Sequence, residues 1–252
     1  MMRTLQSKKV LLGLFLSLFL IVVPHGSDAW GEKQEAFVGK EVVYTEKVYT
    51  LKGYLSKPKG LGPFPAVIYN HGGLGNKIGG SPGEASEALA RAGYVGFSPM
   101  RRPTVPMSGH LDDVMDALDY VKGLNYVDKD QIAIIGFSRG GYLAYVAGAI
   151  RNDIKAIIIM AAAPGRRDRH QFLANAAKIS SPVLLIVAEN DNVREDHVTL
   201  MKRMKTALDQ EGKHTEFILY PPYQNDGHRM FFEIGSYWTD VLRFLDKTLK
   251  KR

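Results

Sequence analysis

The chain has 252 residues, of which 45% are hydrophobic and 23% charged, and its formal net charge is +7. These proportions are typical of a folded globular protein, and no fixed-period repeat or low-complexity tract interrupts them, so a disordered chain, a collagen and a solenoid are excluded. The positive charge includes no long basic run and no interleaved aromatic residues, which favours an ordinary solvated surface over a nucleic-acid partner.

The N-terminal stretch predicts a signal peptide over residues 1–29, followed by one domain over residues 30–252. Basic residues precede an uncharged run at 10–23, and the small residues Ser27 and Ala29 then mark a cleavage site. That run is shorter than the roughly 20 residues that a membrane-spanning helix needs, which favours cleavage after Ala29 over an uncleaved anchor. The chain has no cysteine, so it needs no disulfide and carries no cysteine-linked lipid. We therefore expect a secreted or periplasmic protein without a stable membrane anchor.

The rest of the chain alternates between short apolar strands and helices. An edge hairpin is expected over residues 41–54, because Val, Tyr and Thr dominate there before a turn at 57–60. The strands expected after it are residues 66–70, 94–98, 131–136, 156–160, 183–188 and 215–220. The expected helices are residues 84–92, 111–124, the segment after Ser138, a short one at 172–178, 196–210 and 236–249. Continuous apolar strands separated by helices indicate an α/β fold: a mostly parallel sheet of about eight strands, with helices on both faces and a minimal cap.

One serine stands at a turn between a predicted strand and a predicted helix. Residues 132–135 are apolar, and the sequence Gly-Phe-Ser-Arg-Gly follows at residues 136–140 with Ser138 at its centre. Such a turn leaves no room for side chains on either side of the serine, which explains both glycines, and it lifts the hydroxyl above the sheet. The helix N-terminus beyond it supplies backbone N–H groups to a negatively charged oxygen. Ser138 is therefore the predicted nucleophile.

A serine nucleophile needs a base, and the base needs an acid to orient it. After this kind of turn the acid precedes the histidine along the chain. Asp191 follows an apolar strand, with Glu189 as the reserve candidate, and His228 follows the last strand in the loop before the closing helix. His197 is assigned to a helix away from the strand ends. The predicted catalytic residues are Ser138, Asp191 and His228.

Backbone N–H groups from two places are expected to form an oxyanion hole. One belongs to Arg139, the residue after the nucleophile, and the other to the loop His-Gly-Gly-Leu-Gly at residues 71–75. Within that loop Gly73 or Leu74 is the predicted donor, because glycine lets the backbone turn its amides inward. A phosphate-binding loop is the alternative interpretation, but neither glycine pattern of nucleotide-binding loops is present.

The strand-HGG, strand-GFSRGG, strand-AENDN and loop-DGH patterns together resemble the dienelactone hydrolase branch of the α/β-hydrolases, close to the catalytic domain of prolyl oligopeptidase. The resemblance extends from about residue 43 to the C-terminus. It implies an α/β-hydrolase fold and hydrolysis of esters, lactones or peptides, with the triad carried by Ser138, Asp191 and His228. The nucleophile of dienelactone hydrolases is a cysteine, which this chain lacks, so the resemblance does not predict a dienelactone activity.

The predicted function is that of an exported serine hydrolase that cleaves carboxylic esters through an acyl-enzyme, with no metal and no organic cofactor. A serine peptidase acting on short peptides, an acyltransferase and a non-catalytic binding protein on the same fold remain alternatives. The expected partner is a small ester or short peptide, and the sequence does not predict the oligomeric state.

Substrate contacts are predicted from basic and aromatic residues near the strand ends. Arg101 and Arg102 follow one strand, Arg166 follows another, and Tyr223 lies close to His228 in the sequence. Arginines that converge on the site would favour a substrate carrying a carboxylate, because a guanidinium binds a carboxylate through two parallel hydrogen bonds. Arginines solvated on the loops are the alternative.

Overall fold

A computed structural model describes residues 35–75, 82–165, 173–193 and 195–250 of the chain. The predicted signal peptide and Arg166 lie outside these residues. The strands are β1 (Phe37–Thr45), β2 (Leu51–Lys57), β3 (Phe64–Asn70), β4 (Val95–Pro99), β5 (Val127–Phe137), β6 (Ile154–Met160), β7 (Val183–Ala188) and β8 (Thr215–Tyr220). The helices are α2 (Pro82–Arg91), α3 (His110–Gly123), α4 (Arg139–Ile150), α5 (His197–Gln210) and α6 (Trp238–Leu249), with 3-10 helices η2 (Leu173–Lys178) and η3 (Gly227–Phe232).

The eight strands form one sheet in the order β1-β2-β4-β3-β5-β6-β7-β8. The β1–β2 and β2–β4 pairs are antiparallel, and all other pairs are parallel. The central parallel strands are apolar along most of their length and buried, as expected for strands covered by helices on both faces. This confirms the predicted α/β-hydrolase fold and the edge hairpin.

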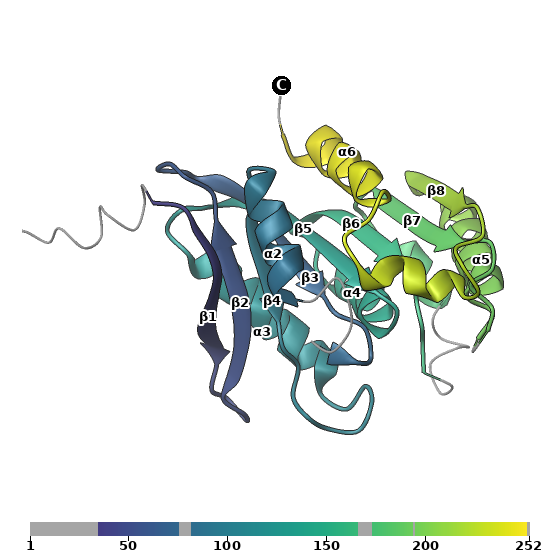
Figure 1. Cartoon of the computed structure of the whole chain (residues 1–252), viewed down its shortest axis with the longest axis horizontal. Helices are drawn as coiled ribbons and strands as arrows, with labels where there is room; N and C mark the ends of the chain where they lie inside the picture. The colour runs from purple at the N-terminus through teal and green to yellow at the C-terminus, as the bar shows by residue number, and fades with distance from the viewer. Residues whose placement is uncertain (1–34, 76–81, 166–172, 194, 251–252) are drawn as a thin grey trace, which may run out of the picture.

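The order of the strands decides which helices cover which face. From β3 the chain passes through α2 to β4, and from β4 onward it crosses the sheet in the opposite direction. Because crossovers between parallel strands are right-handed, α2 lies on one face and α3, α4 and α5 on the other, with α6 returning to the face of α2 (Figure 1). The carboxyl ends of β3 and β5, where this direction reverses, are the place where ligands bind in open α/β sheets.

The element boundaries differ from the prediction mainly at two places. β5 begins at Val127, four residues before the predicted start, because Val127 pairs with Phe64 at the beginning of β3. The segment predicted as a loop before the closing helix contains η3, which starts where the side chain of Asp226 accepts a hydrogen bond from the His228 amide. None of the helices in the described residues is long and apolar enough to cross a membrane.

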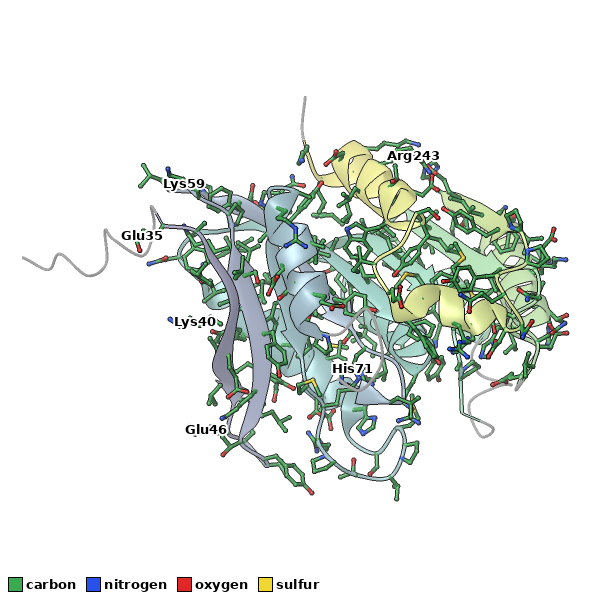
Figure 2. All side chains as sticks on the ribbon, viewed as in Figure 1. Glu35, Lys40, Glu46, Lys59, His71 and Arg243 are labelled. Atoms are coloured by element: carbon green, nitrogen blue, oxygen red, sulfur yellow. The ribbon has the colours of Figure 1, made fainter. Side chains whose placement is uncertain are left out.

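Many charged side chains lie at the surface, but polar side chains are also buried, and two of these lie at the carboxyl end of β3. Lys40, Lys59 and Arg243 point outward from the hairpin, the following turn and α6, whereas His71 lies inside the molecule, just after β3 (Figure 2). The side chains of Asn70 and His71 are both buried. The loop after β3 therefore brings polar groups into the interior next to the start of α4.

The N-terminus of α4 packs directly on the end of β3. A Cβ atom added to Gly140 would lie 2.0 Å from the carbonyl oxygen of Asn70 and 2.6 Å from that of His71. A Cβ atom added to Gly136, at the other side of the turn, would lie 2.1 Å from the carbonyl oxygen of Gly140. These contacts involve backbone atoms that have no room to move aside, so both glycines are required by packing.

Replacing Gly140 by alanine is expected to lower the free energy of unfolding by about 3 kcal/mol, because an overpacked site strains the surrounding backbone. Gly123→Ala serves as the matched control, since a Cβ atom there meets nothing within 4 Å. It lies at the exposed end of α3, where alanine in a helix is favoured by up to about 1 kcal/mol. Urea unfolding of both variants measures the difference, and equal midpoints would contradict the packing argument.

Candidate active site

Ser138 lies at the turn between β5 and α4 in a backbone conformation that non-glycine residues rarely adopt, with φ 55° and ψ −118°. The turn is held from outside: the Ser138 amide donates to the carbonyl of Met160 at 2.8 Å, and the Ser138 carbonyl accepts from the amide of Ala163 at 2.9 Å. A strained residue of this kind costs about 1–3 kcal/mol and persists where the surroundings determine it. The effect is to present the hydroxyl at the carboxyl end of the sheet, in a pocket.

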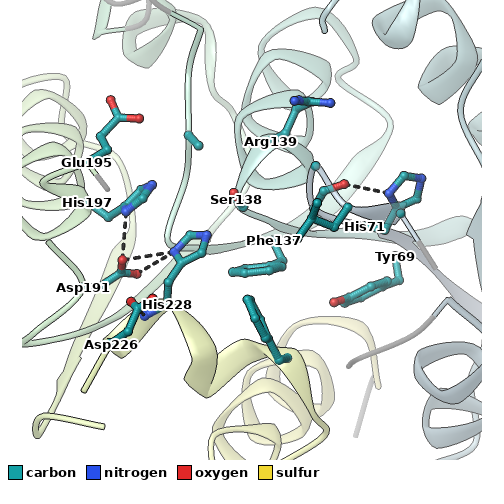
Figure 3. A pocket seen from close by; sticks show the side chains of 16 residues that line it. Tyr69, His71, Phe137, Ser138, Arg139, Asp191, Glu195, His197, Asp226 and His228 are labelled. Atoms are coloured by element: carbon teal, nitrogen blue, oxygen red, sulfur yellow. Dashed lines mark hydrogen bonds and ion pairs between the residues drawn. The ribbon is translucent and has the colours of Figure 1, made fainter. Parts of the chain in front are cut away.

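Asp191 follows β7 and accepts hydrogen bonds from two histidines. Its Oδ1 lies 2.8 Å from Nδ1 of His197, and Nδ1 of His228 lies 3.0 Å from Oδ2 and 3.1 Å from Oδ1 (Figure 3). Burial acts to raise the pKa of the Asp191 carboxyl, but the hydrogen bonds and charge of His197 and His228 lower it further, so its pKa lies below the ordinary value. Asp191 is therefore ionised at neutral pH although its side chain is 1% exposed.

His228 is fixed on several sides. It stands in the first turn of η3, and Gly227 before it packs so closely on the turn at Asp191 that an added Cβ would lie 2.7 Å from the Asp191 amide nitrogen. The imidazole lies between the rings of Phe137 and His197, with centroids 4.7 Å and 4.4 Å away. Because Nδ1 faces Asp191, the other ring nitrogen is directed toward Ser138 (Figure 3). This is the orientation that a base acting on the serine hydroxyl requires.

His197 was not predicted as a site residue, and the structure places it in the site. The residue begins α5, its amide donates to the carbonyl of Asp191 at 3.1 Å, and its ring stacks on His228 with an interplanar angle of 23°. The assignment to a helix was right, but this helix starts at the strand end. The short loop between Asp191 and α5 could have indicated this position. His197 follows Asp191 by six residues, and its amide binds the Asp191 carbonyl, so the two side chains lie close together.

The three side chains Asp191, His197 and His228 offer ligand atoms within 4.8 Å of one another, a set that suits a metal ion in composition. The lone pair of an imidazole nitrogen lies in the ring plane, and a zinc ion would lie about 2 Å from each nitrogen. Since the two rings are stacked, their in-plane directions run side by side rather than converging on one point. The geometry fits two hydrogen bonds to a carboxylate better than a metal centre.

The predicted oxyanion loop, residues 71–75, lies next to Ser138. A Cβ atom added to Gly72 would lie 3.6 Å from Cβ of Ser138, and one added to Gly73 would lie 3.2 Å from a guanidinium nitrogen of Arg139. Arg139 is the first residue of α4, so its amide has no intrahelical acceptor. The structure thus brings together the loop and the helix N-terminus that were predicted to supply N–H groups.

These groups surround a pocket of about 340 Å³. Gly73, Leu74 and Arg139 line it together with Ser138 and His228, and Tyr69, Phe137 and Phe232 supply aromatic surface. The volume lies at the small end of the range for ligand pockets. The site therefore accommodates a small molecule or a short side chain of a larger one.

Arg101 and Arg102, predicted as substrate contacts, do not line this pocket. Arg101 is buried and donates to the backbone carbonyls of His71 and Gly72, whereas Arg102 forms an ion pair with Asp113 at 2.6 Å. Tyr223 is also absent from the lining, because its backbone binds the side chain of Asn190 at the turn after β7. Arg101 and Arg102 both follow β4, but each binds a partner within the protein. Glu189, the reserve acid, is exposed.

The fold is that of an α/β-hydrolase, and comparison with known proteins identifies the family. The dienelactone hydrolase family matches residues 100–229, about half of the chain, and the chain belongs to this family. A provisionally named carboxymethylenebutenolidase from Aquifex aeolicus is 25% identical over 181 residues, which span 64% of this chain and 76% of that protein. Mouse (Mus musculus) dipeptidyl peptidase 8 is 29% identical over 136 residues, which span 45% of this chain and 15% of that protein.

Solved structures show the same fold. A provisionally named dienelactone hydrolase from Klebsiella pneumoniae superposes with a TM-score of 0.66 at 19% identity, covering 82% of this chain and 98% of that chain. Acylaminoacyl peptidase from Pyrococcus horikoshii superposes with a TM-score of 0.71 at 16% identity, covering 89% of this chain and 44% of that chain. The resemblance expected from the sequence is confirmed, and the chain is a hydrolase of the dienelactone hydrolase family.

Proposed function

We propose that this protein is a serine hydrolase that cleaves small carboxylic esters through an acyl-enzyme. The observation that supports this most directly is the pairing of a serine at a strained strand–helix turn with a histidine that is held by a buried aspartate, all lining one pocket. Family membership supports hydrolysis as the class of reaction. The small pocket favours a small acyl group.

In the first half of the reaction, Oγ of Ser138 attacks the ester carbonyl carbon while Nε2 of His228 takes the hydroxyl proton. The new bond makes the carbonyl oxygen an anion, and the amides of Arg139 and Gly73 donate to it. Asp191 stabilises the imidazolium without taking its proton. The imidazolium then protonates the leaving alcohol as the carbon–oxygen bond of the ester breaks, which leaves an acyl group on Ser138.

In the second half, a water molecule replaces the alcohol. His228 takes a proton from the water as its oxygen attacks the acyl carbon, and the same amides again bind the oxyanion. Collapse of this intermediate returns the proton to Oγ of Ser138 and releases the carboxylic acid. Every proton in the cycle moves through one ring nitrogen, and for that reason the orientation of His228 by Asp191 matters.

The test of this proposal is labelling with a fluorophosphonate probe, which phosphonylates an activated serine. We expect one adduct on the peptide that contains Ser138, and Ser138→Ala is expected to abolish it and to lower ester hydrolysis by about 10⁴-fold to 10⁶-fold. Ser98→Ala is the matched control, because Ser98 is a buried serine on β4 outside the pocket lining. Folded wild-type protein that takes no label would refute the proposal and favour a non-catalytic binding protein.

A peptidase is the second candidate, and it is supported by the likeness to dipeptidyl peptidase 8 and acylaminoacyl peptidase. The same residues would cleave an amide, with a leaving amine in place of the alcohol. Matched acyl esters and peptide amides, assayed side by side with the purified protein, distinguish the two substrates. An alcohol added as a second acceptor, with analysis of the product, reports acyl transfer.

The positive charge of Arg139 influences which acyl groups the pocket accepts. Arg139 lines the pocket, and among the described residues no carboxylate forms an ion pair with it. Partial burial lowers the pKa of the Arg139 guanidinium. Because the ordinary pKa of arginine is so high, the group stays charged at neutral pH. A cation that has no carboxylate partner among the described residues favours an acyl chain that ends in a carboxylate.

Replacing Arg139 by methionine leaves the backbone amide in place and removes only the charge. We therefore expect kcat/KM for a half-ester of a dicarboxylic acid to fall by about 10-fold or more, as for loss of a hydrogen bond to a charged group. The value for a neutral ester of the same length should stay within a factor of about two. Equal losses on both esters would show that Arg139 does not select for charge.

Export of the protein stays a prediction, supported by the basic, apolar and small-residue pattern of residues 1–29. The N-terminal sequence of the protein recovered from the growth medium or periplasm is expected to begin at Trp30. Recovery of the uncleaved chain with the membrane fraction would show that the segment is an anchor.

A further inference from the structure

Arg101 is a buried arginine whose charge has no acid as a hydrogen-bond partner in the described part of the chain. The residue follows β4 and is 9% exposed. Asp113 is near enough to influence its charge, but Asp113 accepts from Arg102, through Nε at 2.7 Å and through the backbone amide at 2.8 Å. Burial lowers the pKa of Arg101 to about 10, so the residue is a cation at neutral pH. Burying a cation is costly, and the groups that it binds must offset this cost.

Those groups are the two consecutive carbonyls of the oxyanion loop. Nη2 of Arg101 donates to the oxygen of His71 at 2.8 Å and to the oxygen of Gly72 at 2.9 Å. Nε and Nη1 are buried and make no hydrogen bond to any described residue. The arginine therefore acts on this loop through a single nitrogen that joins two neighbouring peptide groups.

The geometry of a peptide group determines what this binding does. Both peptides are trans, since the cis bond found in the described residues lies at Gly62–Pro63, and in a trans peptide the N–H points opposite to the C=O. With the carbonyls of His71 and Gly72 turned to Arg101, the amides of Gly72 and Gly73 point away from it. Both glycines line the pocket on the side of Ser138.

His71 reinforces this arrangement. Its side chain is buried, and Nδ1 lies 2.8 Å from the carbonyl oxygen of Gly72 (Figure 3). The same nitrogen lies 3.0 Å from Nη2 of Arg101. Burial and the charge of Arg101 lower the pKa of His71 to about 3, so the ring is neutral. A neutral ring fills the space beside the cation without repelling it.

We propose that Arg101 is a positioning residue for the oxyanion hole: it turns the amides of Gly72 and Gly73 toward the pocket, where the Gly73 amide donates to the substrate oxygen at Ser138. The cation also polarises the two peptides, because its charge, the peptide dipoles and the developing oxyanion lie in sequence across the loop. This role explains an arginine that is buried without a carboxylate. It rests on the proposed serine hydrolase function, and it assigns to Arg101 a role other than substrate binding.

The experiment compares Arg101→Met with Arg151→Met. Arg151 lies beyond the C-terminal end of α4, remote from the pocket, and forms ion pairs with Asp153 and Asp119, so its loss also destabilises the fold. For Arg101→Met we expect kcat to fall by about 10-fold to 100-fold, less than or equal to the loss of one oxyanion donor, with KM within a factor of about two. The rate of phosphonylation of Ser138 should fall in parallel, because that adduct also places an oxygen in the hole. Arg151→Met is expected to lower the melting temperature and to keep kcat.

A purely structural role for Arg101 would move the melting temperature alone. If Arg101→Met is destabilised like Arg151→Met but retains kcat and the rate of phosphonylation, the inference is wrong. Should Arg101→Met not fold, Arg101→Lys decides, since lysine keeps the charge but its shorter side chain does not extend to the position of Nη2. A kcat below that of the wild type at unchanged KM supports the inference, and a wild-type kcat overturns it.

The outcome for Arg101 is separable from that for the proposed function. Wild-type protein that neither takes the fluorophosphonate label nor cleaves any ester contradicts the serine hydrolase proposal before the variants are compared. Wild-type protein that does both, together with an unaffected Arg101→Met, contradicts only the role of Arg101.

Discussion

The architecture of the site depends on how closely the start of α4 approaches the end of β3. Gly140 touches the carbonyl of Asn70 at a distance that leaves no space for a methyl group, and Gly136 touches the backbone of the same helical turn. This contact forces the chain to reverse within a few residues, and Ser138 takes up the strain in its backbone. It also places the loop after β3 beside the first amides of α4. Ser138 and the loop at residues 71–75 are thereby positioned by one packing contact between backbone atoms.

Two buried charges lie near Ser138, and neither is paired with the other. Asp191 is an anion that holds His197 and His228, and Arg101 is a cation that holds two carbonyl groups. In the proposed reaction, a positive charge develops on His228 and a negative charge on the substrate oxygen. Asp191 thus acts directly on the positive charge of His228, and Arg101 acts through two peptide groups on the negative charge of the substrate oxygen, a form of electrostatic preorganisation.

The pairing of two histidines with one carboxylate has a structural consequence. His197 occupies the side of the His228 ring that Phe137 leaves open, so the base is enclosed between two flat surfaces. The carboxylate is in turn held in one rotamer by two donors on different elements, α5 and η3. The orientation of His228 is therefore determined by packing and hydrogen bonding together, as a base that moves every proton of a reaction requires.

The sequence alone determined the features that depend on local chain geometry. Apolar strands alternating with helices require a covered parallel sheet, and glycine on both sides of Ser138 between a strand and a helix requires a sharp turn, so the fold and the candidate nucleophile could be predicted. The order of the acid and the histidine along the chain was sufficient to propose Asp191 and His228. These inferences depend on neighbouring residues and on the order of successive strands and helices, both of which are visible in the linear sequence.

Only the tertiary structure decided how side chains from different loops are paired. The sequence favoured Asp191 and kept Glu189 in reserve, and the structure turns Asp191 to the histidines and Glu189 to solvent. The prediction from the sequence missed His197, which reaches the site because α5 begins at the sheet edge. The same prediction assigned both Arg101 and Arg102 to the substrate. In the structure Arg101 binds backbone carbonyls and Arg102 binds Asp113. The sequence does not reveal which way the side chain of an arginine after a strand points, because that direction depends on partners that are distant along the chain.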